Sequence, residues 1–271
     1  MTTHAIDWPI LLPALVAGLL VLVTHVPLGK QVLSKGIVFI DLAIAQIAGL
    51  GVIAANAVGW EAQGWQVQAT ALSAALAGAA LLTWTDKRFA DIQEALIGAL
   101  FVVSSCVAIV LLASNPHGGE QLKDLLVGQI LWVSWAQIGL MAVVSAIVLG
   151  LWYGLGAQRL GRMGFYCVFA LAVTASVQLV GVYLVFSSLI IPALAVRTVP
   201  AQLQTAAALA IGAVSYLLGL LLSAVFDLPS GALIVLVMAV VAMLCAALFK
   251  CLKSQILSKS ALSEVGTQKI M

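Results

Sequence analysis

An uncharged, largely apolar run extends from Phe165 to Val196 and is followed by Arg197. About 20 apolar residues are enough to cross the hydrocarbon core of a bilayer, which is roughly 30 Å thick. The run is too long for one ordinary crossing. It predicts either one overlong helix or two helices joined at Val180-Gly181 by a very tight turn, and we favour two helices.

The composition indicates that lipid is the main solvent of the chain. Hydrophobic residues make up 63% of the 271 positions and charged residues only 8%, which excludes an ordinary soluble domain. The four cysteines have no CxxC spacing and lie in or beside apolar segments, so we expect buried free thiols and no zinc knuckle or disulfide framework. These are Cys106, Cys167, Cys245 and Cys251.

Hydropathy along the chain predicts an all-α polytopic membrane helix bundle with about nine transmembrane helices. The predicted spans are Trp8–Val26, Ile37–Val58, Trp65–Trp84, Ala95–Ser114, Trp135–Tyr153, Gly164–Val180, Val182–Val196, Leu203–Phe226 and Gly231–Phe249. If the two spans that flank Gly181 were one tilted helix, the count would be eight.

The distribution of charge favours nine spans over eight. With nine spans, eleven of the 12 Lys and Arg residues lie on one side of the membrane. The opposite side receives only Lys123 among the basic residues, together with acidic residues such as Asp7 and Glu61. The positive-inside rule then places the amino terminus outside and the carboxyl terminus in the cytoplasm. Eight spans would put Arg197 and the basic tail outside, which breaks the pattern.

The chain is predicted to have one domain and no soluble module. Residues 1–250 form the membrane domain, and residues 251–271 form a short cytoplasmic tail, either helical or disordered. The first span has no basic segment before it and no small-residue cleavage site after it, so we expect it to remain as a helix rather than to be removed as a signal peptide.

The sequence lacks the motifs of common enzymes. It contains no Gly-rich phosphate loop ending in Lys-Ser/Thr, no HExxH, and no nucleophile with a suitable His among its three histidines. We therefore expect a non-catalytic protein without a bound cofactor. If it pumps, another subunit must hydrolyse ATP.

Polar residues at membrane depth are the candidate functional groups, because they are costly in hydrocarbon. Asp41, which Gln46 follows five residues later, has two interpretations. It is a cation contact or gate, or it is a carboxylate that reaches the membrane interface or pairs with Lys35. Residues five apart are separated by about 140° on a helix, so these two do not chelate one ion without a distortion. Other candidates for a translocation path are Gln178, Ser187, Ser188 and Pro192, where the proline is expected to kink its helix. The serines and glutamine could instead hydrogen-bond neighbouring helices.

Five motifs in the same order resemble the permease subunits of zinc, manganese and iron ATP-binding-cassette transporters, often called ABC-3 permeases. They are Pro27-Leu28-Gly29 after the first predicted helix, Glu94 before Ile97-Gly98, Val180-Gly181-Val182, Ile190-Ile191-Pro192-Ala193, and Asp227-Leu228-Pro229-Ser230-Gly231. Together they cover most of the chain.

The resemblance implies a metal contact in the second helix. In that family an Asp is followed four residues later by a His. Here these positions hold Leu42 and Gln46, and Asp41 is displaced by one. A carboxamide suits zinc less well than an imidazole does, so manganese, another hard cation or a chelated metal also fits.

The resemblance also implies partners. These are a second permease copy in a homodimer, a cytoplasmic ATPase and an extracytoplasmic metal-binding protein. Family members dock on the ATPase through a longer loop between helices five and six, which is reduced here to about ten residues beside Arg159 and Arg162. These two arginines are the predicted ATPase-coupling residues.

The resulting prediction is a permease subunit for divalent metal uptake in the cell membrane, the inner or cytoplasmic one, with the metal ion as substrate. Two alternatives remain open at this point. One is a metal-transporting or proton-coupled secondary transporter, and the other is a non-transporting membrane assembly or scaffold protein with the same fold.

Overall fold

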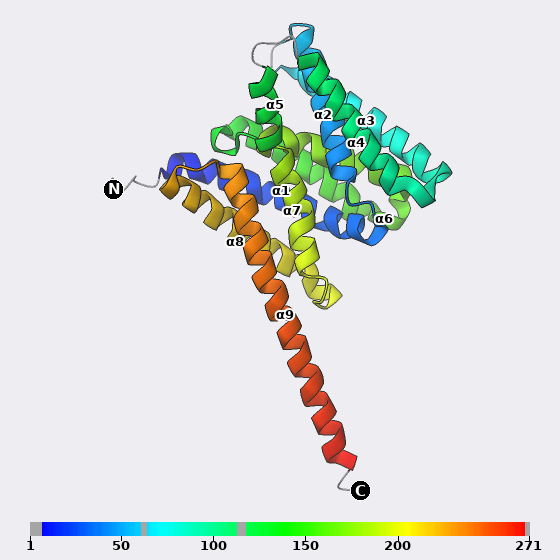
Figure 1. Ribbon diagram of the computed structural model, residues 1–271, viewed down its shortest axis with the longest axis vertical. Coiled ribbons are helices and arrows are strands. Elements are labelled where there is room, and N and C mark those ends of the chain that lie inside the picture. Colours follow the sequence, from blue (N-terminus) through cyan, green and yellow to red (C-terminus); the bar gives the residue numbers. More distant parts are fainter. Residues whose placement is uncertain (1–6, 61–63, 113–117, 269–271) are drawn as a thin grey trace.

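The computed structural model describes residues 7–60, 64–112 and 118–268, and within these ranges the chain forms helices and turns with no strand (Figure 1). The predicted all-α helix bundle is confirmed. The helices are α1 (Trp8–Lys35), α2 (Ile40–Ala57), α3 (Trp65–Arg88), α4 (Gln93–Leu112), α5 (Gly118–Val127), α6 (Trp135–Val180), α7 (Val182–Ala195), α8 (Ala201–Phe226) and α9 (Ser230–Gln268), with short 3-10 turns at Ala90–Ile92 and Ile130–Trp132.

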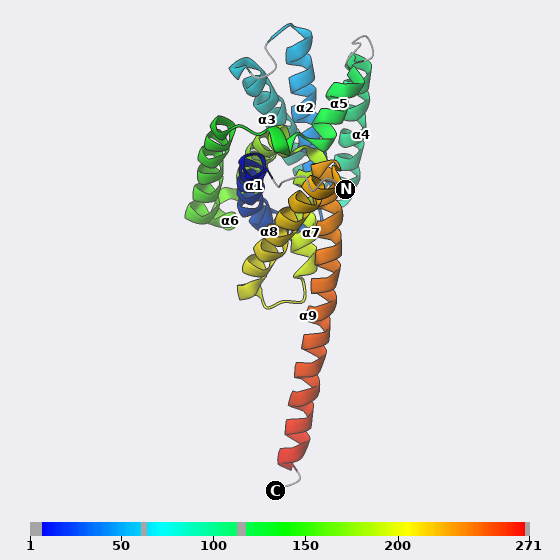
Figure 2. The same ribbon diagram turned by 90° about the vertical axis from the view of Figure 1, so that its left-hand side faces the viewer.

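Within the described ranges, seven helical segments are long and apolar enough to cross a membrane, and α2 and α7 are shorter apolar helices. Each of the predicted spans falls on one of these segments. The number of actual crossings and the orientation of the termini stay predictions. Beyond the bundle, α9 continues to Gln268 and projects away from the other helices (Figures 1 and 2).

The first helix is longer than predicted, because α1 continues through Pro27 to Lys35. The Pro27-Leu28-Gly29 motif therefore lies inside the helix and not after it. Proline in a helix interior removes one backbone hydrogen bond, but Leu28 and Val32 are buried beyond it, and their packing keeps the chain helical. The helix ends at Gly36, which has the left-handed conformation typical of a helix C-terminus (φ 70°).

The break predicted at Gly181 is confirmed. α6 ends at Val180 and α7 begins at Val182, and Gly181 between them has φ 81° and ψ 162°, a conformation open almost only to glycine. A Cβ at Gly181 would also meet the backbone of Gly128, which follows α5. This position therefore requires glycine for its conformation and for the close approach of α5.

A second interruption divides α6 itself. Gly156 (φ 73°, ψ 150°) and Gly161 (φ 61°, ψ −168°) are not helical, so α6 consists of the segments Trp135–Gly156 and Arg159–Val180. These are the predicted fifth and sixth spans. The second is 67% buried over its most apolar part, whereas the first is 22% buried, so the second segment lies inside the bundle and the first at its periphery.

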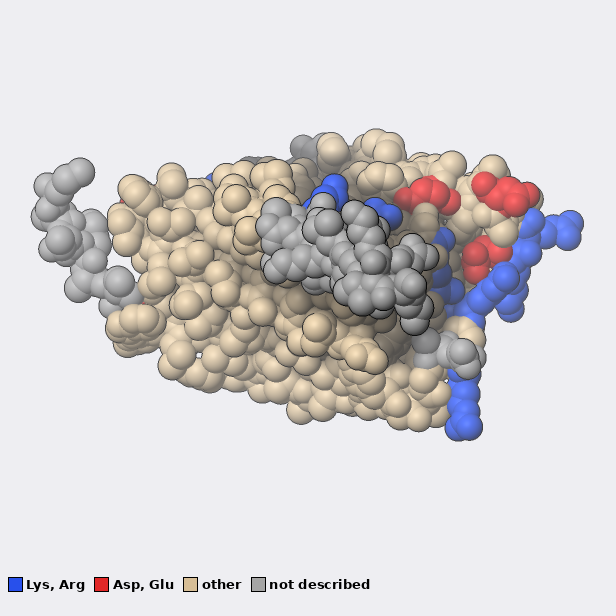
Figure 3. All heavy atoms as spheres, turned by 90° about the horizontal axis from the view of Figure 1, so that it is seen from below, with Lys and Arg blue, Asp and Glu red and all other residues tan. Residues whose placement is uncertain are grey.

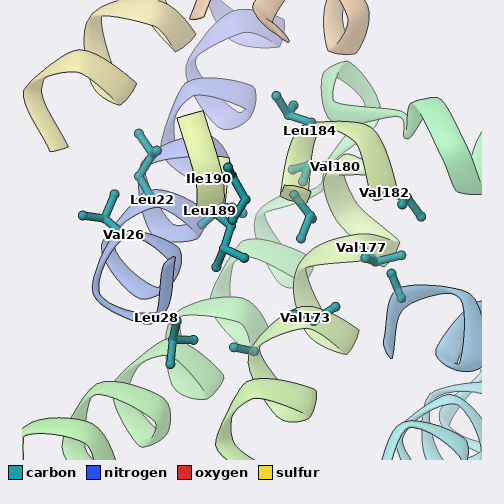
Figure 4. Close-up of a cluster of buried hydrophobic side chains, with 14 of the residues drawn as sticks. Leu22, Val26, Leu28, Val173, Val177, Val180, Val182, Leu184, Leu189 and Ile190 are labelled. Carbon is teal, nitrogen blue, oxygen red and sulfur yellow. The ribbon is translucent and has the colours of Figure 1, made fainter. Parts of the chain in front are cut away.

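The core lies where α1, the second segment of α6 and α7 meet. Figure 4 shows Leu22 and Val26 of α1 near Leu189 and Ile190 of α7, with Val177 and other valines of α6 nearby. Burial of such aliphatic side chains stabilises a protein by about 1.5–3 kcal/mol each in water. Within a membrane the close fit of the side chains, rather than their removal from water, holds the helices together.

The connection expected between Asn115 and Ser134 contains a helix, α5, that the sequence did not suggest. Its Leu122 and Leu125 pack against a small apolar cluster formed by Ile53 of α2 and by Leu112 of α4. α5 is therefore fixed across the ends of α2 and α4 by its apolar side, at the end of the bundle that also holds Gly181.

Several of the basic residues predicted to share one side lie at the other end of the bundle, which we call the basic end. There Lys35 lies 5.2 Å from the ring centre of Phe165, and Lys30 Nζ donates a hydrogen bond to Thr205 Oγ1 over 3.1 Å. Arg162 Nε lies 3.6 Å from Asp86 Oδ2. Figure 3 shows Lys and Arg beside a few acidic side chains on part of the visible face, whereas most of that face is uncharged.

Candidate functional site

Asp41 lies in the first turn of α2, which begins at Ile40 and not at the predicted Ile37. Its side chain is fully buried, and neither carboxyl oxygen has a hydrogen-bond partner among the described residues. It forms no hydrogen bond with Lys35, whose ammonium group lies over Phe165 instead. The positive end of the α2 dipole favours an anionic side chain here. A buried carboxyl without a partner is nevertheless costly, and this makes Asp41 the foremost candidate functional group.

Neighbouring helices hold the start of α2 in place. The backbone N–H of Phe39 donates a hydrogen bond to Glu94 Oε1 of α4 over 3.2 Å. Next to Glu94, Gln93 Nε2 donates to the Leu82 carbonyl oxygen (3.1 Å) and to the Tyr166 hydroxyl (3.4 Å). The segment that carries Asp41 is therefore linked to α3, α4 and the second segment of α6 through polar side chains.

Gln46 is buried further along α2, with 7% of its surface exposed. α3, α4, α6 and α7 all contact α2, so both faces of the helix are covered. This explains how Asp41 and Gln46 are both buried although they point in directions about 140° apart. The two side chains therefore do not form one chelating pair on a regular helix.

Gln178 lies near the opposite end, in the second segment of α6, and its Nε2 is buried without a hydrogen-bond partner among the described residues. It lines two adjoining cavities, of about 350 Å³ and about 240 Å³, both of which also include Gln137. Thr174, whose hydroxyl is likewise buried and unpartnered, lines the larger cavity, and Asp124 of α5 lines the smaller. Gln178 therefore faces the two cavities, near the end of the bundle that α5 covers.

Ser187 and Ser188 bond within the protein. Their hydroxyls donate to the carbonyl oxygens of Tyr183 and Leu184, each over 2.7 Å, and Ser188 Oγ also lies 2.9 Å from the Tyr216 hydroxyl of α8. These contacts favour the packing interpretation of the two serines. Pro192 is buried inside α7, which continues to Ala195. Its ring removes the hydrogen bond that the carbonyl of Ser188 would otherwise accept.

Arg159 and Arg162 are exposed at the basic end, beside the interruption in α6. Arg162 makes an ion pair with Asp86 and also donates from one of its terminal guanidinium nitrogens to the Asp86 carbonyl oxygen, over 3.3 Å. These contacts hold the short connection between the two segments of α6 against the end of α3. Arg159 extends from the same connection.

The predicted site residues are not gathered in one place. Asp41 lies at the basic end, Ser188 lies inside the bundle, and Gln178 lies near α5. In the part of the chain that the structure describes, no three His, Cys, Asp or Glu side chains converge into a metal-binding group. Such a series of separated polar groups suits successive contacts along a path better than one tight metal cage.

Sequence reasoning missed Thr174 and Lys30 as site residues. Gln137, which lines both cavities, forms a capping box with Ser134 at the start of α6, and the Ser-x-x-Gln spacing is typical of this motif. Thr174 carries no such signal, because its cavity exists only through the packing of α3 on α6. The position of Lys30 depends on its hydrogen bond to Thr205, which is remote in sequence.

Residues 7–160 and 153–250 match the sequence profile of the family described as the ABC 3 transport family. The chain belongs to this family. The resemblance inferred from the five motifs is thereby confirmed.

Two curated relatives of this ABC 3 family protein match most of its length. An uncharacterized membrane protein of Synechocystis sp., slr2045, is 26% identical over 263 residues, which cover 88% of this chain and 90% of the relative. The manganese transport system membrane protein MntC of Halalkalibacterium halodurans is 25% identical over 248 residues, covering 83% and 82%. Among solved structures, PsaBC from Streptococcus pneumoniae in complex with Fab has a TM-score of 0.71 at 20% identity, covering 88% of this chain and 91% of that chain. This last likeness supports the fold.

Motifs that are far apart in this ABC 3 family chain meet in the structure. A Cβ at Gly29 would collide with the backbone carbonyl of Leu189, immediately before Ile190-Ile191-Pro192-Ala193. A Cβ at Gly231 would meet the carbonyl of Val127, beside the residue that Gly181 contacts. Gly29, Gly181 and Gly231 therefore mark places where backbones approach too closely for a larger residue, whereas a Cβ at Gly98 would have open space around it.

Proposed function

We propose that this chain is the membrane-spanning permease subunit of an ATP-binding-cassette transporter that takes up a divalent metal ion across the cell membrane. The observation that carries the proposal is the buried carboxyl of Asp41, which has no partner among the described residues, within a fold of the ABC 3 transport family. Such a carboxyl oxygen is available to a cation that passes along α2. The similarity to a manganese transport membrane protein supports a metal substrate.

Manganese or another hard cation suits the polar groups better than zinc does. Asp41, Gln46 and Gln178 offer carboxyl and carboxamide oxygens, which hard divalent cations prefer, whereas zinc favours imidazole and thiolate ligands. The separation of these groups favours an ion that keeps part of its water shell at each contact. The metal is substrate here, and no resident cofactor is required.

The basic end is the proposed contact with a cytoplasmic ATPase. Arg159 and Arg162 border the short connection in α6, and Arg162 binds Asp86 at the end of α3. From α6, Tyr166 contacts Gln93, and the adjacent Glu94 bonds to Phe39 at the start of α2. A movement of this connection can therefore reach the helix that carries Asp41 through direct contacts.

The complete transporter would contain two permease copies, two ATPase copies and an extracytoplasmic metal-binding protein. ATP-driven closure of the ATPase pair would pull the basic end and change access to Asp41. The cavities that share Gln137 and Gln178 lie toward the α5 end, which would face the binding protein. The permease itself would be the non-catalytic subunit.

The test is cellular metal content, measured by mass spectrometry, with the chain co-expressed with an ATPase and a metal-binding protein encoded beside it. The control carries an ATPase variant that cannot hydrolyse ATP. A rise in one metal that disappears in the control supports the proposal and names the substrate. A rise that persists in the control points to secondary transport, and no rise from an assembled complex refutes metal transport.

A further inference from the structure

A groove of about 630 Å³ lies at the basic end, where α1, the first segment of α6, α7 and α8 meet. Two cationic side chains line it, Lys30 of α1 and Arg197 just after α7. Thr205 and Gln204 at the start of α8 add hydrogen-bonding groups. No Asp or Glu is among the described residues that line this groove, so its local charge is positive.

Lys30 is held in position in the groove. Its ammonium group donates one hydrogen bond to Thr205 Oγ1, over 3.1 Å, and an ammonium group has three donors in all. The threonine hydroxyl is a neutral acceptor and does not compensate the positive charge. Arg197 adds a planar guanidinium group that can bind two oxygens of one anion at once. The pair is therefore suited to a phosphate group.

Aromatic side chains lie at the edge of the groove. Trp152 and Tyr153 line it, and Tyr153 is 66% exposed. Such aromatic residues favour the headgroup level of a bilayer. On the same segment of α6, Leu140, Val143 and Ile147 are 60%, 58% and 49% exposed, so the outer face of this segment is apolar. Aromatic residues at the groove and an apolar outer face on the same segment favour a lipid over a free phosphate compound.

We propose that this groove binds the phosphate-bearing headgroup of an anionic phospholipid, with the phosphate between Lys30 and Arg197 and the acyl chains along the outer face of α6. Basic pockets between transmembrane helices are suited to such headgroups. A groove of about 630 Å³ leaves room for a glycerol phosphate headgroup. The bound lipid would join α1, α7 and α8 at the end proposed to contact the ATPase.

The experiment measures the thermal unfolding midpoint of the purified full-length chain in detergent during titration with dioleoyl phosphatidylglycerol or dioleoyl phosphatidylcholine. The wild-type protein is expected to be stabilised saturably by the anionic lipid and much less by the zwitterionic one. The double variant Lys30→Gln/Arg197→Gln is expected to bind phosphatidylglycerol about thirtyfold more weakly, because each basic residue contributes to attraction of anionic lipid.

The matched control is Lys87→Gln/Arg88→Gln, which removes the same charge from the end of α3 but lies outside the groove. Unchanged affinity in this control supports the site, whereas an equal loss in both double variants overturns it in favour of general surface attraction. The exchange Lys30→Arg/Arg197→Lys should retain binding. Its failure to bind while it unfolds at the wild-type temperature would contradict a role for the two charges.

Two further measurements test other ligands of the groove. Glycerol phosphate in solution is expected not to raise the unfolding midpoint, and protection equal to that by the lipid would overturn the lipid assignment. Co-purification of the ATPase is then measured for Lys30→Gln/Arg197→Gln. If this variant keeps its affinity for phosphatidylglycerol but loses the ATPase, the groove is a protein-docking surface and the proposal is wrong.

Discussion

The carboxylate of Glu94 accepts a hydrogen bond from the backbone N–H of Phe39 over 3.2 Å, and this bond joins the start of α4 to the start of α2. The first N–H groups of a helix have no partner within the helix, and the residue before them often needs an external acceptor as well. In the sequence Glu94 stands out only as part of a motif. In the structure it positions the turn that carries Asp41.

Replacement of Glu94 by Ala should destabilise the protein by about 1 kcal/mol, because the Phe39 N–H loses its acceptor. Glu94→Gln keeps an oxygen at the same position and should cost less than about 0.5 kcal/mol. Chemical unfolding in detergent, followed by tryptophan fluorescence, measures both values. Equal losses for the two variants would show that the charge of Glu94, and not the hydrogen bond, is what matters.

Asp41→Asn should lower cellular metal accumulation at least about tenfold, which corresponds to the loss of roughly 1.4 kcal/mol of interaction with the ion. The unfolding midpoint should stay the same or rise, because the variant removes a buried ionisable group that has no partner among the described residues. Metal content and thermal unfolding are measured on the same preparations. Wild-type accumulation by Asp41→Asn would assign Asp41 to packing.

Gly181→Ala should prevent normal folding. Its backbone conformation (φ 81°, ψ 162°) is unfavourable for alanine, and the added Cβ would meet Gly128, so we expect a loss of about 3 kcal/mol or more. Gly139→Ala is the matched control, because Gly139 lies in helical α6 and a Cβ added there would have open space around it. That variant should fold as well as wild type. Size-exclusion profiles of fluorescent fusions compare the yields, and a normal profile for Gly181→Ala would contradict the structure of this turn.

Ser188 and Ser187 provide a comparison within one helix. Ser188→Ala should destabilise the protein by about 1–2 kcal/mol, because Tyr216 loses its partner on α7, whereas Ser187→Ala should cost less than about 0.5 kcal/mol. In the double variant Ser188→Ala/Tyr216→Phe both polar groups are removed, and much of the stability should return. A double-mutant cycle in detergent measures this coupling. Purely additive losses would argue against the bond.

The helical architecture was predictable because long apolar stretches with basic ends allow few arrangements in a bilayer. The turn at Gly181 was predictable for the same reason, since an uncharged run of that length exceeds one crossing. The nature of that turn was not predictable, because it depends on the approach of Gly128 from a distant part of the chain. The extension of α1 through Pro27 was missed because burial of Leu28 and Val32 outweighs local propensity.

The candidate site was predictable only in part. Asp41 stands out in any apolar sequence, but the absence of a partner for it among the described residues depends on Lys35 lying over Phe165. The cavities at Gln178 and the basic groove at Lys30 arise from packing between remote helices. A single sequence carries no signal for such juxtapositions. The amphipathic helix α5 was missed because glycines and charged residues surround its few leucines.

ATP-driven passage of a metal ion through the permease is measured as metal influx into proteoliposomes that contain the purified permease and its ATPase. Radiolabelled manganese and zinc are offered with the metal-binding protein on one side and ATP on the other. We expect influx of one metal, manganese being favoured, that requires ATP and an intact ATPase and is lost in Asp41→Asn. Influx that is the same without ATP, or no influx from an assembled complex that hydrolyses ATP, would refute ATP-driven metal transport by this chain.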